Sequence, residues 1–115
     1  MSQDSVSRQE RVLLFSGSSR SATLAESAAN FDHVLVKIAR DGFSQWVTTK
    51  SGETASTVLF VNAATSYAVM LNLYTSGTSM SVTSEIGMPI SAYKFGTGSA
   101  QSSTYIREVV GVLLG

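Results

Sequence analysis

Short apolar runs recur along the first half of the chain, separated by residues that favour turns. Residues 11–15 form the first run, and a Ser-Gly-Ser segment at 16–18 closes it. Residues 32–39 form the second run, in which every other side chain is apolar: Val34, Val36 and Ile38. Such alternation places one set of side chains on one face of a strand. The pattern predicts β-strands joined by short turns.

A tight hairpin is predicted immediately after the second run. Asp41-Gly42 suits the positive φ angles of a two-residue hairpin turn. Residues 43–49 are therefore expected to return antiparallel to residues 32–39.

The second half of the chain repeats this organisation. Residues 57–61 are apolar on both faces, which predicts a central strand. Residues 67–75 alternate well, and Ser76-Gly77 turns the chain into a further strand at 78–83. Residues 90–95 are a weaker strand candidate, 96–103 are predicted to be a loop, and 105–113 close the chain as a long apolar strand.

These runs predict one all-β domain, an antiparallel β-sandwich or jelly roll of about eight or nine strands. Its single helical candidate is residues 23–30, where Thr23 and Glu26 have capping-box spacing, and at most one short helical turn is expected there. Residues 1–10 are polar and are expected to form a flexible or partner-binding arm before a single sandwich domain at 11–115.

Charge is scarce and balanced, with eight basic and eight acidic residues that together make up 14% of the chain. Residues 54–84 contain no charged side chain. The balance argues against binding of nucleic acid, which requires a basic excess on some face, and no membrane insertion is expected. A surface of Ser and Thr is instead easily covered by another subunit, since buried unpaired charges are costly. We therefore expect a homo-oligomer, a trimer or a dimer.

Residues for catalysis or cofactor binding are few. There is no cysteine, and His33 is the only histidine, so thiolate and histidine-rich metal sites are excluded. The eight carboxylates are scattered, and no pair is nominated for acid–base work. The sequence predicts a protein that is not an enzyme, with no catalytic residue, metal or cofactor.

Aromatic side chains near strand ends are the candidates for ligand or receptor contact, because such rings stack on sugars or anchor interfaces. The candidates are the aromatic residues Phe43, Trp46, Tyr93 and Tyr105, together with Gln45, an amide side chain next to Trp46. For Trp46 the alternation favours packing in the core, with an interface or a ligand contact as alternatives. Aliphatic residues near the two ends are the candidate subunit contacts: Val6, Val109, Val112, Leu113 and Leu114.

Three segments together resemble the C-terminal β domains of bacteriophage tail fibres and related virion proteins. They are residues 12–18 (VLLFSGS), 23–36 (TLAESAANFDHVLV) and 104–112 (TYIREVVGV). The resemblance implies a virion protein made in the host cytoplasm, since the first ten residues lack the features of a signal peptide. Its expected partners are other virion proteins and, at a tail tip, a cell-surface glycan.

Three functions are therefore weighed. The first is a tail-fibre or tail-tip β domain that oligomerises and contacts the host surface. The second is a decoration (cementing) protein on a phage capsid. The third, from another class, is a carbohydrate-binding module with no role in assembly.

Overall fold

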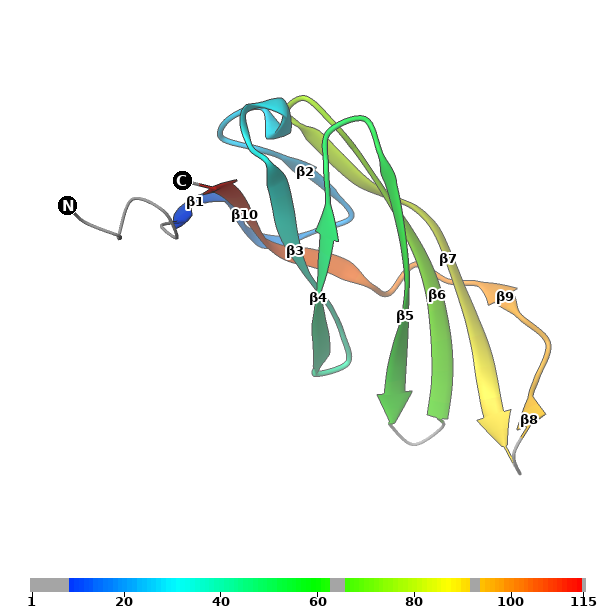
Figure 1. Ribbon diagram of the computed structural model, residues 1–115. Coiled ribbons are helices and arrows are strands. Elements are labelled where there is room, and N and C mark those ends of the chain that lie inside the picture. The colour runs from blue at the N-terminus through cyan, green and yellow to red at the C-terminus, as the bar shows by residue number, and fades with distance from the viewer. Residues whose placement is uncertain (1–8, 63–65, 92–93, 115) are drawn as a thin grey trace.

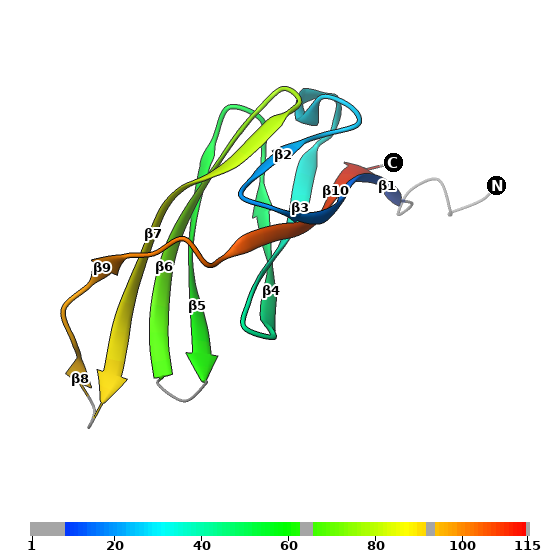
Figure 2. The ribbon, with the colours of Figure 1, turned by 180° about the vertical axis from the view of Figure 1, so that it is seen from behind.

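The protein is built from two antiparallel β-sheets that face each other. The computed structural model describes residues 9–62, 66–91 and 94–114, shown from opposite sides in Figures 1 and 2. The first sheet has four strands, in the order β1 (Gln9–Ser19), β10 (Tyr105–Leu114), β3 (His33–Arg40) and β4 (Phe43–Thr49).

The second sheet has six strands and includes the longest of the described strands. Its main order is β2 (Ser21–Thr23), β7 (Ser79–Ser91), β6 (Ser66–Ser76) and β5 (Thr54–Asn62). Two short strands pair with β7, namely β8 (Lys94–Phe95) and β9 (Ser99–Ala100). The prediction of an all-β sandwich is confirmed.

The turn between β3 and β4 has the backbone expected from its sequence. Asp41 has φ of 50° and Gly42 has φ of 83°, and the two strands pair without a register shift. Positive φ at both turn residues matches the twist of the flanking strands. The predicted hairpin is thus confirmed.

The helical candidate is reduced to one 3-10 turn, η1 (Ala28–Asn30). Its N-cap is Ser27, whose hydroxyl accepts a hydrogen bond from the Ala29 amide. Thr23 instead belongs to β2, so the Thr23–Glu26 spacing does not cap the turn. The expected limit of one short helical turn holds.

The main core lies between the two sheets and is filled by aliphatic side chains from both of them. Its most deeply buried members include Val34, Val36 and Ile38 of β3, Leu73 of β6 and Met80 of β7. The β3 face predicted from alternation is therefore the core face. These five side chains are fully or almost fully withdrawn from water, which supplies the main driving force for folding.

The second sheet extends further than the first. Figures 1 and 2 show β5, β6 and β7 running beyond the β3–β4 hairpin and diverging from it, and the molecule is elongated, with extents of 58 × 28 × 22 Å. A smaller core of Leu59, Val61 and Val69 fills this region, with Phe43 and Tyr67 packed against it.

Two expectations about strands are corrected by the structure. Residues 57–61 lie in β5, which among the described strands pairs with β6 alone and is an edge strand, so the predicted central position is wrong. β1 begins at Gln9, so the last two residues of the predicted arm are part of the sandwich. Residues 1–8 lie outside the described part of the chain.

Candidate functional site

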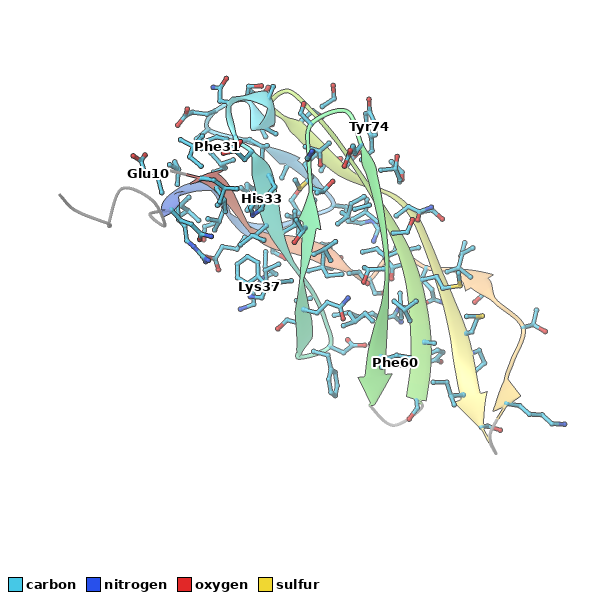
Figure 3. All side chains as sticks on the ribbon, viewed as in Figure 1. Glu10, Phe31, His33, Lys37, Phe60 and Tyr74 are labelled. Carbon is cyan, nitrogen blue, oxygen red and sulfur yellow. The ribbon has the colours of Figure 1, made fainter. Side chains whose placement is uncertain are left out.

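The clearest surface feature is a group of apolar side chains on the outer side of the second sheet, away from the core. We call Val58, Phe60, Met70 and Ile86 the outer apolar patch, and they are 39%, 60%, 48% and 39% exposed. Val58, Met70 and Ile86 are neighbours across β5, β6 and β7, and Phe60 follows Val58 on the same face of β5, two residues further along. Figure 3 shows Phe60 near the far end of β5 and Tyr74 at the opposite end of the β5–β6 pair.

The patch is bordered by a shallow hollow of about 220 Å³. Ser56, Val58, Met70 and Asn72 line it from the outer side of β5 and β6. A protruding phenyl ring beside an apolar-floored hollow is a shape that a second protein surface can match.

The edge of β5 adds backbone groups to this surface. β5 pairs with β6 through nine consecutive residues with no register shift, and no described strand pairs with its other side. It contains no charged residue and no proline. Long regular edge strands without such protection pair readily with another chain.

A second feature is a charged cluster buried between the sheets. The Glu85 side chain is fully buried, and its Oε1 and Oε2 accept from Arg20 Nη1 at 2.6 Å and Arg40 Nη1 at 3.0 Å. Thr104 contributes its amide at 3.1 Å and its hydroxyl at 2.9 Å. Gln101 accepts from Arg40 Nη2 at 3.1 Å. The cluster therefore links four parts of the chain: Arg20 between β1 and β2, Arg40 of β3, Glu85 of β7, and the segment at 101–104 that leads into β10.

Two opposing effects act on the pKa of Glu85. Burial raises it, but hydrogen bonds from Arg20 and Thr104 and the charge of Arg20 outweigh burial, so the pKa lies below its ordinary value of 4.5. The carboxylate is therefore the stable form at neutral pH. All of the partners named here are groups of the same chain, and the cluster holds the two sheets together.

The aromatic candidates are spread over different surfaces. Phe43 is half-buried against the smaller core. Gln45 faces inward and donates a hydrogen bond to the Thr57 hydroxyl. Trp46 is 49% exposed on the outer side of β4, so its predicted core packing is wrong. Tyr105 is exposed and lines a cavity beside the β3–β4 turn, and Tyr93 lies outside the described residues.

The candidate subunit contacts divide in the same way. Val109 and Val112 are buried within the chain, so their side chains are core and do not face another subunit, which corrects the expectation for these two. Leu113 is half-buried and Leu114 is exposed. Val6 lies outside the described part of the chain.

Both features that the structure adds were missed at the sequence level. The alternation of β3 continues from Ile38 to Arg40 and places Arg40 on the core face. A cation in that position indicates that a carboxylate is buried beside it. The outer apolar patch had a signal as well, because residues 57–61 are apolar on both faces. Interpreting that pattern as a central strand concealed the exposed face.

The described residues show no cluster of three metal-ligating side chains. Within the same residues, no helix has the length and apolarity to cross a membrane. Comparison of the chain with protein-family models, curated proteins and solved structures finds no match.

Proposed function

We propose that the protein is a structural component of a bacteriophage virion that acts through self-association of its β domain. The observation that carries the self-association is the character of β5. This strand has the two-sided apolar pattern of a central strand, yet it lies at a sheet edge with one face uncovered. An exposed apolar face of this kind marks a contact surface.

A second copy of the same chain is the partner that fits this face best. β5 and β6 carry no charge, so two copies of the face bring no like charges together. In a two-fold contact each copy presents the same patch, and one residue meets another reciprocally. Phe60 of each copy then fills the hollow beside Val58 and Met70 of the other.

The other sheet is less suited to this contact. Leu13 and Trp46 are exposed on its outer side, but Lys37 lies directly opposite Trp46, and Lys37 and Arg107 line a cavity on the same sheet. Pressing two such surfaces together would bring cations close to one another, which is unfavourable at a desolvated interface. The second sheet is therefore the interface in our proposal.

The energy of the contact can be bounded. Full burial of a Val, Ile, Phe or Met side chain contributes about 1.5–3 kcal/mol. Each patch residue has roughly half of its side chain left to bury, so the four contribute about 4 kcal/mol per copy, or about 8 kcal/mol per pair. Association costs about 4–15 kcal/mol. One charge placed in the patch is thus enough to abolish the contact.

The test compares two matched variants by light scattering. Phe60→Asp places a carboxylate in the patch, and Leu13→Asp places one at a similarly exposed position on the other sheet, where Leu13 is 56% exposed. We expect wild type and Leu13→Asp to have the same oligomeric mass and Phe60→Asp to be a monomer, with all three unfolding cooperatively. A monomeric wild type, or a loss of mass in Leu13→Asp alone, would contradict the proposed interface.

The placement in a virion rests on the resemblance of the three segments to phage tail-fibre β domains. A tail-fibre or tail-tip position is the version we propose, with capsid decoration as the alternative. Immunodetection on tailed particles and on isolated tailless capsids distinguishes them. Signal on tails only supports the tail position, and signal on tailless capsids supports decoration. Absence from both particles would remove the virion role while leaving the self-association test intact.

A further inference from the structure

A cavity of about 350 Å³ lies beside the tip of the β3–β4 hairpin, on the first sheet. Its described lining comes from β3, the hairpin turn, β4, Ser103 in the segment before β10, and the start of β10. Pockets for small ligands begin at about 300 Å³. The cavity is large enough for one small molecule, and it is separate from the outer apolar patch, which lies on the other sheet.

The lining is rich in positive charge for a chain with so few charges. Lys37, Arg40 and Arg107 contribute to it, against Asp41 as the single acidic residue among the described lining residues. Neither Lys37 nor Arg107 forms an ion pair within the described chain. Figure 3 shows Lys37 pointing away from the second sheet.

The position of Arg107 follows from an irregularity in the pairing of β10 with β3. The register shifts between Ile106 and Glu108, so that Arg107 is the extra residue of a β-bulge. Bulges redirect a side chain from the regular alternation and occur often beside functional sites. The bulge brings Arg107 to the cavity that Tyr105 also lines.

Arg40 lies at the inner end of the cavity and is held by other groups of the chain. Its side chain is only 8% exposed, and two of its nitrogens donate to Glu85 and Gln101. The third, Nε, is buried and has no hydrogen-bond partner, with Asp41 Oδ2 at 3.6 Å. Buried donors without an acceptor are uncommon and call for an explanation. The neighbouring Asp41 carboxylate supplies that explanation, because it forms an ion pair with Nε.

We propose that this cavity binds a small saccharide that carries a carboxylate, of the uronic acid class. The carboxylate would accept charge-assisted hydrogen bonds from Arg107 and Lys37. The sugar hydroxyls would bond to Asp41 and to the hydroxyls of Ser44 and Ser103, and the ring would pack against Tyr105. A sulfate ion would interact with the same cations, but unlike the saccharide it has no hydroxyl group that could donate a hydrogen bond to Asp41.

The test is a calorimetric titration of the folded full chain with glucuronate, with glucose as the neutral counterpart and with sulfate as the inorganic anion. We expect glucuronate to bind at least about tenfold more tightly than either of the others. Arg107→Gln and Lys37→Gln are each expected to weaken glucuronate binding about tenfold or more, since each removes a charged donor. Arg40 is left unchanged because it also holds Glu85.

Controls separate binding from folding and from assembly. Arg11→Gln and Lys50→Gln remove exposed cations far along the sheet from the cavity and should bind glucuronate like wild type. Phe60→Asp should also bind it, because the cavity does not depend on self-association. No heat with glucuronate, equal binding of glucose or sulfate, or unchanged binding by folded Arg107→Gln and Lys37→Gln would each overturn the proposal.

Discussion

Replacing Glu85 by glutamine tests the buried charged cluster with almost no change of shape. The carboxylate accepts from Arg20 and Arg40 and receives two further hydrogen bonds from Thr104. A carboxamide keeps only one accepting oxygen, so the donors at the other position lose their acceptor. It also removes the negative charge that both guanidinium groups face, and Arg40, only 8% exposed, keeps only its longer ion pair with Asp41 at 3.6 Å.

The expected cost is large for a domain of this size. Removing one partner of a buried ion pair costs about 3–5 kcal/mol, and single domains have a total stability of about 5–15 kcal/mol. We therefore expect Glu85→Gln to fold but to unfold at a much lower urea concentration than wild type at neutral pH. Glu26→Gln, at an exposed residue of the β2–η1 connection, is the matched control and should leave the midpoint unchanged.

The pH dependence provides the sharper result. The folded pKa of Glu85 lies below its ordinary value of 4.5, so its contribution is fully present above that value and is lost as the pH falls through the folded pKa. The protonated carboxyl of wild type and the carboxamide of the variant are then similar, since both are neutral. The gap in unfolding free energy between wild type and variant should narrow once the pH falls below the ordinary value of 4.5. A gap that is absent at neutral pH, or equally wide under strongly acidic conditions, would refute the reasoning.

Two further stability predictions concern packing. Gly111→Ala should lower the unfolding free energy by about 1–3 kcal/mol, because a Cβ there would lie 2.6 Å from the Phe31 ring; in a Phe31→Leu background the same change should cost less, and equal costs in both backgrounds would argue against this contact. Trp46→Ala, at a residue 49% exposed, should cost well under the roughly 3–5 kcal/mol of a core tryptophan, as measured by urea unfolding with circular dichroism.

Local features of this fold could be predicted because short segments determine them. The β3–β4 hairpin depends on the backbone preferences of Asp41 and Gly42, and the core face of β3 depends on alternation. Neither requires knowledge of distant residues. For the same reason, the short helical turn could be bounded but its cap could not be assigned, since Ser27 and Thr23 are both suitable capping residues.

Features that depend on sheet order could not be predicted in the same way. The sequence of β5 does not determine whether another strand pairs with its free edge or whether another layer covers its outer face. Trp46 shows the same limit, because alternation defines two faces of β4 but not which one meets the core. That choice follows from pairing with β3, where Trp46 is opposite Lys37 on the outer side.

The buried charged cluster was the hardest feature to predict from the sequence. Arg40 could be inferred to face the core from its place in β3. Its meeting with Glu85 and Arg20 requires the two sheets to be packed together, because the three residues come from different parts of the chain.

The central claim is that two copies meet through the outer apolar patch, and methionine methyl groups report on it directly. Met70 lies in the patch and Met80 is fully buried in the core. In a mixed sample, one copy carries ¹³C-methyl methionine and the other is unlabelled, and an isotope-filtered experiment detects only contacts between copies. We predict cross-peaks from the Met70 methyl to aromatic protons of the other copy, and none from Met80. A monomeric chain, or an oligomer in which Met70 shows no such contact, would contradict the account.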